Sequence, residues 1–220
     1  MSADALYELM STQRAIRRLR SDPIPDDVMK RILTAATWAP SGGNQQPWRM
    51  VLVRDGAKKK ALGEMYTALW EKFAAMYRKR FQGLSPEEQA KEEKTIAAGD
   101  YLCAHFHEVP AVAIVCFNPK MMAVTDAGQD RVSVVGGGSV YPAVQNLMLA
   151  CRAEGVGCVL TTLLCQVESE VKSLLDLPDN WYTCAAVPMG YPVGGGYGPI
   201  KRLGADDLVF EDSWKNKISL

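Results

Sequence analysis

The strongest periodic pattern in the chain is an apolar stripe over residues 58–81. Its members recur with the spacing of one helical face: Leu62, Met65, Tyr66, Leu69, Trp70, Phe73, Met76, Tyr77 and Phe81. Ser85, followed by a proline and by Glu88, is typical of a helix start and predicts a second helix running toward His107. The pattern therefore predicts two consecutive long helices within residues 58–108.

Shorter patterns on either side of this stretch alternate between helices and strands. Helical spacing predicts helices over residues 4–19, 26–39, 140–155 and 167–178. Apolar runs of strand length lie at residues 48–55, 109–117, 156–163 and 181–192, and the second of them is apolar throughout, as in a sheet covered on both faces. This order predicts an α/β sandwich in a single domain, residues 1–220, with residues 58–108 as a helical lid or insertion.

The composition excludes several classes of protein. Lys plus Arg and Asp plus Glu are balanced at 25 each, so the charge gives no reason to expect nucleic acid as a partner. The chain has neither an 18-residue apolar run nor the apolar core of a signal peptide, so we expect no membrane span and no export. Six cysteines lie mostly in apolar runs without metal-binding spacing, which predicts free thiols and a cytoplasmic location.

Two basic clusters are candidate anion sites. The segment QRAIRRLR, residues 13–20, would place Arg14 on one helical face with Arg17 and Arg18, where guanidinium groups could bind a phosphate. The same cations could simply complement the dipole of a helix end in water. A second cluster, Lys201 and Arg202, lies in the aperiodic tail, and the two clusters could close on one phosphate.

Other motifs are weaker. The run GGGS, residues 136–139, precedes a helix but matches no nucleotide-binding pattern, so a flexible turn is favoured there. His105 and His107 would point apart on a helix, so we expect no metal site. Because no nucleophile and base pair can be identified either, we expect a cofactor to perform the chemistry.

The junction APSGGNQQPW, residues 39–48, contains more prolines, glycines and small polar residues than a simple chain reversal needs. Together with RAIRRLRSDPIP, AVQNLMLACRAEGVGCVLTTL and LLDLPDNWYTCAAVPMGYP, followed by KRL, it resembles the FMN-dependent nitroreductase family. These segments cover nearly the whole chain in the family's order. The resemblance implies a mixed central sheet flanked by helices, an intertwined homodimer with a C-terminal extension, FMN as cofactor and NAD(P)H as co-substrate.

The resemblance also implies which residues bind FMN. Those of the basic clusters, at the phosphate and the pyrimidine edge, are Arg14, Arg17, Arg18, Lys201 and Arg202. Those that reach a flavin bound mainly by the other subunit are Pro40, Ser41, Gly42 and Asn44. Those whose backbone lies against the ring are Leu160, Thr161, Thr162 and Leu163. No side chain is implied as catalytic; the Arg17 side chain and the Thr162 backbone would tune the flavin.

The sequence departs from the family's pattern at several positions. Ala15 stands where serine is common, which removes one hydroxyl contact to the phosphate, and Leu19 replaces an aromatic residue. An Asn/Lys pair near the pyrimidine ring has no match, so Arg17 would carry that role alone. Glu64-x-Tyr66 stands where the iodotyrosine deiodinase branch has Glu-x-x-x-Tyr, which argues against deiodination.

The implied function is the reduction of nitroaromatic, quinone or activated-ene acceptors by a ping-pong mechanism through flavin N5. Alternatives are a specialised member of the family, either a reductive dehalogenase or a flavin-degrading enzyme, and a flavin-binding protein without turnover. The aromatic residues Trp70, Phe73, Tyr77 and Phe81 would either stack on a flat acceptor or belong to the core or the dimer interface.

Overall fold

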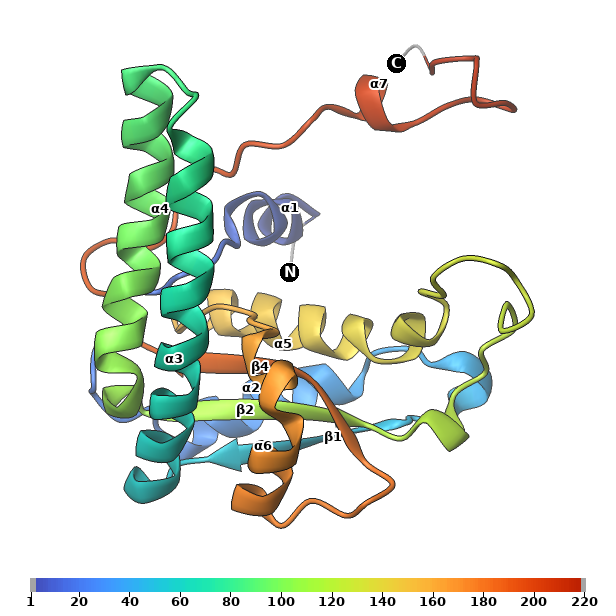
Figure 1. The fold of residues 1–220 in the computed structure, drawn as a ribbon. Helices are drawn as coiled ribbons and strands as arrows, with labels where there is room; N and C mark the ends of the chain where they lie inside the picture. The colour runs from blue at the N-terminus through green and yellow to red at the C-terminus, as the bar shows by residue number, and fades with distance from the viewer. Residues whose placement is uncertain (1–2, 219–220) are drawn as a thin grey trace.

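The computed structural model describes residues 3–218, and a four-stranded sheet lies at its centre (Figure 1). The strands are β1 (Trp48–Val53), β2 (Ala111–Phe117), β3 (Gly157–Cys158) and β4 (Tyr182–Gly190), in the spatial order β1-β2-β4-β3. Neighbouring strands of the described chain pair antiparallel. The α/β class with flanking helices is confirmed, whereas the sheet of one chain is antiparallel rather than mixed.

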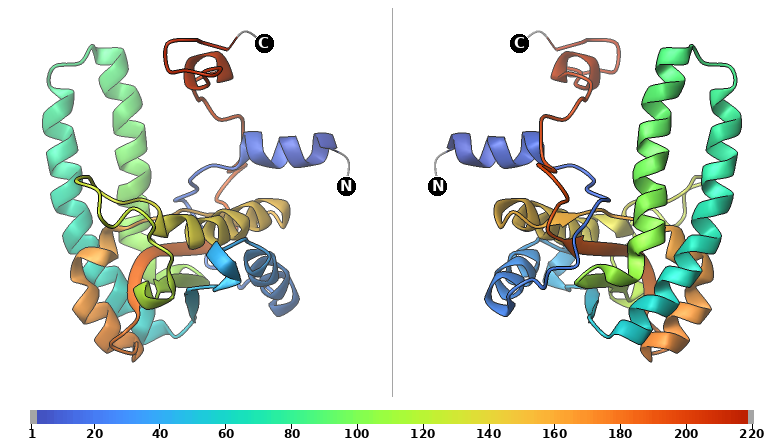
Figure 2. Two further views of the ribbon diagram at one scale, coloured as in Figure 1. Left: turned by 90° about the vertical axis from the view of Figure 1, so that its right-hand side faces the viewer. Right: turned by 90° about the vertical axis from the view of Figure 1, so that its left-hand side faces the viewer.

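Helices cover both faces of the sheet (Figure 2). The alternate residues Ala111, Ala113 and Val115 of β2 belong to a buried cluster with α2 (Asp26–Thr37) and α5 (Tyr141–Ala153). Val112, Ile114 and Cys116 belong to the cluster on the other face, with α3 (Gly56–Phe81) and α6 (Glu168–Leu175). Burial on both faces explains why this strand is apolar throughout.

Helices α3 and α4 (Pro86–His105) form a long hairpin that projects beyond the sheet (Figure 1). Asp55 begins α3 by accepting a hydrogen bond from the Lys58 backbone N–H at 2.8 Å, and Ser85 begins α4 in a reciprocal capping box with Glu88. Both predicted helices are confirmed. Neither of them, nor any other helix within residues 3–218, combines the length and the apolar character needed to cross a bilayer.

The N-terminal helix is shorter than the sequence predicted. Helix α1 (Ala3–Thr12) buries no residue, and the following segment, residues 13–20, runs along the edge of the sheet without forming a helix. The Ile16 N–H donates to the Cys158 carbonyl at 2.9 Å. Ile16 and Leu19 reach the core because Gly157 has no side chain: a Cβ there would lie within 2.9 Å of both. The prediction that Arg14 shares a helical face with its neighbours was therefore wrong.

The third strand is also shorter than predicted. Residues 157–158 pair with β4, and Thr161 pairs with Ala186 in the same register, but the ladder is interrupted between them. The β4 residue that would face Val159 is Pro188, which has no N–H to donate to a ladder. Residues 159–163 consequently form an open segment rather than a continuous strand.

The C-terminal segment leaves the body of the fold after crossing the N-terminal segment. The Val193 N–H donates to the Arg18 carbonyl at 2.9 Å, and the Ile200 N–H to the Ser11 carbonyl at 3.1 Å. Beyond this point the chain projects outward and carries the short helix α7 (Ala205–Leu208) (Figures 1 and 2). Exposed apolar side chains along it include Leu203, Leu208 and Trp214.

Candidate functional site

A pocket of about 350 Å³ lies where the helical hairpin meets the edge of the sheet. One wall consists of residues from the hairpin, namely Tyr66, Trp70, Phe73, Tyr77, Glu92, Thr95 and Ile96, and the other consists of residues 159–163. Arg17 completes the lining, and we call this cavity the Arg17 pocket. The pocket therefore brings Arg17 together with four other residues that the resemblance assigned to the flavin, namely Leu160, Thr161, Thr162 and Leu163.

Arg17 is a half-buried cation that faces the pocket. Burial lowers the pKa of Arg17, and the electrostatic interaction with Tyr66 acts in the opposite direction. Its guanidinium forms no hydrogen bond or ion pair with any residue within 3–218. A buried charge without a partner is costly, so this site suits a ligand that presents negative charge or hydrogen-bond acceptors.

Tyr66 is the most deeply buried aromatic residue of the pocket lining. Its ring stacks on Phe106 at a centroid distance of 5.0 Å, and the residue is 2% exposed. Burial raises the pKa of Tyr66 to about 12, although the Arg17 guanidinium and the Thr161 hydroxyl pull it down. The hydroxyl is therefore neutral at neutral pH. Sequence reasoning placed Tyr66 in the apolar stripe and compared it with the tyrosine of the deiodinase motif, but did not include it among the residues of the site.

Replacing Tyr66 by phenylalanine should reduce the alkaline loss of stability. An unfolded tyrosine ionises near pH 10 while the folded Tyr66 stays protonated to about pH 12. The free energy of unfolding therefore falls through this window, by about 1.4 kcal/mol per pH unit. Urea denaturation across the window should give a shallower fall for Tyr66→Phe, and the exposed Tyr7→Phe serves as the control. Identical profiles for Tyr66→Phe and wild type would contradict the assignment.

The open segment 159–163 offers a backbone donor to the pocket. Thr161 exchanges two backbone hydrogen bonds with Ala186, at 2.9 and 2.8 Å, which anchors the segment to β4. Its side-chain oxygen accepts from the Leu163 N–H at 3.3 Å. Thr162 is exposed, and its N–H has no hydrogen bond in the part of the chain that the structure describes. This N–H is available to an acceptor atom of a ligand.

The remaining basic residues lie outside the pocket lining. The Arg18 guanidinium lies over the Tyr101 ring, 4.9 Å from its centroid. Arg14, Lys201 and Arg202 are exposed, and Arg202 donates to the Lys201 carbonyl at 2.9 Å. The hydrogen bond between the Ile200 and Ser11 backbones joins the two chain segments that carry these clusters.

The loop that carries Pro40, Ser41, Gly42 and Asn44 is not brought to the pocket within one chain. It forms the turn η1 (Gly42–Asn44) at the end of α2, away from the hairpin (Figure 1). The Gly42 N–H donates to the Ser139 hydroxyl at 3.0 Å, and Ser41 accepts from the Gln46 N–H at 2.9 Å. The GGGS run is thus a short 3₁₀ helix, η4 (Gly136–Ser139), and its Ser139 hydroxyl holds this loop in place through the hydrogen bond from Gly42.

The cysteines and histidines do not form a metal site within residues 3–218. His105 Nδ1 lies 3.0 Å from Glu108 Oε2. All six cysteines are free thiols, as predicted, and three of them are fully buried.

The fold is that of a known family of proteins. A solved structure of oxidised iodotyrosine deiodinase, bound to FMN and 3-iodo-L-tyrosine, superposes with a TM-score of 0.67 over 94% of this chain and 98% of that chain, at 22% identity. The sequence profile of the nitroreductase family matches residues 10–191, and the chain belongs to this family.

Two curated relatives align over most of their length. An NADH dehydrogenase of Thermus thermophilus is 34% identical over 204 residues, which cover 90% of this chain and 91% of the relative. A 5,6-dimethylbenzimidazole synthase of Rhodospirillum rubrum is 31% identical over 189 residues, which cover 86% of this chain and 82% of the relative. The resemblance seen in the sequence is confirmed at the level of the family, and the protein is an oxidoreductase.

Proposed function

We propose that the protein is an FMN-dependent oxidoreductase that uses NAD(P)H to reduce nitroaromatic, quinone or activated-ene acceptors. The observation that carries the proposal is the unpaired Arg17 cation beside the open Thr162 N–H in one pocket. The Thermus relative is named for NADH, and the solved deiodinase holds FMN, which supports both the donor and the cofactor.

The residues of the pocket fit an isoalloxazine ring. When bound, FMN supplies hydride transfer at its N5 atom. Arg17 would stabilise negative charge at the pyrimidine edge of the ring, and the Thr162 N–H would donate to an acceptor atom. Leu160, Thr161 and Leu163 would support one face of the ring. The hairpin residues would exclude water from the other face while donor and acceptor bind in turn.

Purified protein should be yellow with stoichiometric FMN, and Arg14→Ala or Arg202→Ala should weaken its retention. We assign Arg14 and Arg202 to the FMN phosphate, together with Lys201 and with Arg18, which lies over the Tyr101 ring. Loss of one charged hydrogen bond predicts about tenfold to hundredfold weaker FMN binding. Fluorescence titration of the apoprotein with FMN measures the change. Arg54→Ala, which removes a surface cation paired with Asp26 at 2.7 Å, is the control.

A colourless protein that takes up no FMN would refute the proposed cofactor. Unchanged FMN affinity in both arginine variants would instead refute only the phosphate site.

We also propose a homodimer in which the Ser41–Asn44 loop of one subunit serves the pocket of the other. In one chain this loop lies away from the Arg17 pocket, and an apolar groove lies between α1, α2 and α5. The apolar residues that line this groove are Leu6, Leu9, Ala35, Trp38, Leu149, Ala150 and Ala153. The exposed C-terminal segment offers further apolar surface for a partner subunit.

Sedimentation of the FMN-bound protein should give twice the mass of one chain. Trp38→Glu, which places a charge in the apolar groove, should shift this equilibrium toward monomer and release FMN. Trp38 is 76% exposed in the single chain, so the substitution does not disturb the core. A wild-type monomer that retains FMN would contradict the shared site.

A second candidate is a reaction that consumes the flavin, because a relative at 31% identity is a 5,6-dimethylbenzimidazole synthase. Anaerobic reduction followed by exposure to air separates the two functions. Return of the oxidised flavin spectrum, with rapid reoxidation by menadione or a nitrofuran, supports acceptor reduction. Fragmentation of the flavin supports the synthase reaction, and deiodination of 3-iodotyrosine would support the dehalogenase alternative. The free thiols favour the cytoplasm as the compartment.

A further inference from the structure

We propose that Asp100 is a positioning residue that fixes the indole of Trp70 as a flat wall of the Arg17 pocket and so makes the pocket selective for planar aromatic acceptors. The inference rests on the proposed function, because it concerns the acceptor that shares this pocket. Asp100 belongs to α4 and lies outside the pocket lining, so it would act on the ligand through Trp70 alone.

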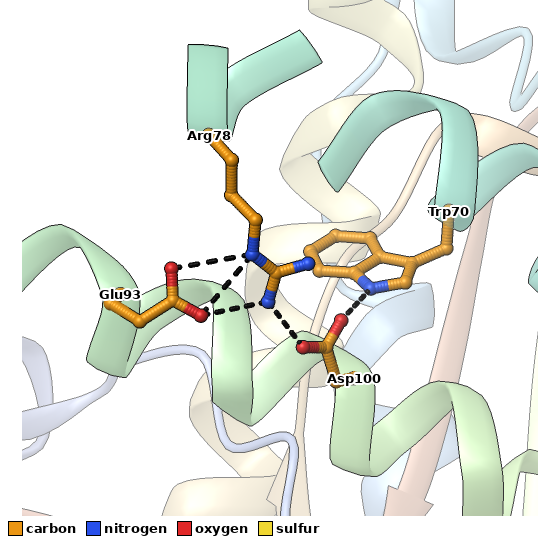
Figure 3. Close-up of polar contacts among 4 residues, drawn as sticks. All are labelled: Trp70, Arg78, Glu93 and Asp100. Atoms are coloured by element: carbon orange, nitrogen blue, oxygen red, sulfur yellow. Dashed lines mark hydrogen bonds and ion pairs between the residues drawn. The ribbon is translucent and has the colours of Figure 1, made fainter. Parts of the chain in front are cut away.

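Trp70 is held on two sides by α4. Its Nε1–H donates to Asp100 Oδ1 at 2.7 Å (Figure 3). The neighbouring Gly99 lets the ring lie against the helix backbone, since a Cβ there would be 2.0 Å from Trp70 Cζ2. The indole is nearly buried, so its N–H needs this acceptor. The combination defines one orientation of the ring.

Asp100 is itself fixed by Arg78 of α3. The Arg78 guanidinium donates to Asp100 Oδ2 at 2.7 Å and to Glu93 Oε1 at 2.7 Å, and these contacts join the two helices beside Trp70 (Figure 3). Burial tends to raise the pKa of Asp100, but the hydrogen bonds from Trp70 and Arg78 hold it below its ordinary value. The carboxylate is therefore ionised and accepts from both sides.

The aromatic surface continues from Trp70 along α3. The Phe73 ring lies 5.5 Å from Trp70, and Tyr77 stacks on Phe73 at 4.4 Å. These three rings line the cavity opposite Leu160 to Leu163. Phe73 and Tyr77 cover part of each other's faces, so a planar aromatic ligand in this cavity would make edge-to-face or offset contacts with the rings that a compact non-planar acceptor cannot match. The orientation of Trp70 thereby becomes a determinant of acceptor choice.

Asp100→Leu should raise the Kd for menadione and the KM for menadione and a nitrofuran by about fivefold to tenfold. The kcat with ferricyanide, which has no flat ring, should stay within twofold of wild type. Asp100→Asn should restore most of the affinity, because its amide oxygen can still accept from the indole N–H. Glu87→Gln removes an exposed carboxylate of the same helix outside the pocket and is the matched control.

A second variant tests whether Asp100 acts through Trp70. In a Trp70→Phe background, which lacks the indole N–H, adding Asp100→Leu should change the menadione Kd by less than twofold. A full additional loss in this background would overturn the inference. So would an unchanged menadione Kd for Asp100→Leu in the otherwise native chain.

Two readouts are independent of turnover. The menadione Kd is measured on oxidised protein without NAD(P)H, and ¹⁵N-indole NMR follows the signal that Trp70→Phe removes. The chemical shift of that signal should change in Asp100→Leu and should stay near its native value in Asp100→Asn. An unchanged chemical shift in Asp100→Leu would overturn the inference. A wild-type protein that holds no FMN refutes the proposed function instead, while both readouts still report on Asp100. If Asp100→Leu does not fold, Gly99→Ala, which displaces the same ring, should give the same rise in Kd.

Discussion

Replacing Arg17 by glutamine should slow reduction of the bound flavin by NAD(P)H by about a hundredfold to a thousandfold, the usual effect of removing a preorganised charge from a developing anion. Arg17 forms no ion pair with any residue within 3–218, although Glu92 also lines the pocket, so its charge is free to act on the ligand. When FMN is bound, hydride addition would place negative charge on its ring, and the Arg17 guanidinium would stabilise that charge. The reduction potential of the flavin should therefore fall in the variant.

Anaerobic stopped-flow bleaching measures the rate, and equilibration with redox dyes measures the potential. Arg20→Gln is the control, because Arg20 lies on the same segment but is exposed and paired with Asp22 at 3.2 Å. Arg17→Lys should recover part of the rate, since it keeps the charge without the planar guanidinium. An Arg17→Gln protein that binds FMN and keeps the wild-type potential would remove Arg17 from the mechanism.

Truncating Phe106 to alanine should lower the free energy of unfolding by about 3–5 kcal/mol. The ring is fully buried and stacks on Tyr66, and Gly63 of α3 approaches so closely that a Cβ there would be 3.3 Å from Phe106. The cavity left behind cannot close without moving the base of the hairpin. A loss of this size is a large fraction of the stability of a typical domain.

Urea denaturation at a fixed FMN concentration measures the effect, since bound ligand adds to apparent stability. Met76→Ala, on the same hairpin but 45% exposed, should change the free energy by much less. A Phe106→Ala protein within about 1 kcal/mol of wild type would show that the site relaxes more than its packing indicates.

Local signals predicted the elements that form without help from distant segments. The stripe over residues 58–81 and the Ser85 capping box predicted both helices of the hairpin, and the apolar run of β2 predicted a strand covered on both faces. These patterns reflect spacing and capping within one element. They needed no knowledge of the partner surface.

The errors arose where distant residues decide the local structure. Residues 13–20 leave the helix because Gly157 opens a place for Ile16 and Leu19, which lie some 140 positions earlier in the chain. Pro188 of β4 shortens the strand that would face it. The residues within either segment carry no information about which residue of a distant strand will lie beside them.

The candidate site was predicted in part. The resemblance placed Arg17 and residues 160–163 at one cofactor, and the structure brings them into one pocket. It gave no reason to include Tyr66 or Asp100, because their roles depend on how α3 and α4 pack on each other. The assignment of Ser41 and Asn44 to a flavin stays a prediction, because it requires a second subunit.

The separation of the two pocket walls along the chain has a consequence for engineering and for divergence. The aromatic wall is encoded within one uninterrupted stretch, the projecting hairpin, whereas Arg17 and the open segment 159–163 belong to the body of the fold. If the proposed function holds, we expect a recombinant in which another family member supplies the outer hairpin to take on that donor's range of acceptors and to keep the recipient's cofactor. On this proposal, substitutions confined to the hairpin would change the acceptor range without changes in the rest of the protein.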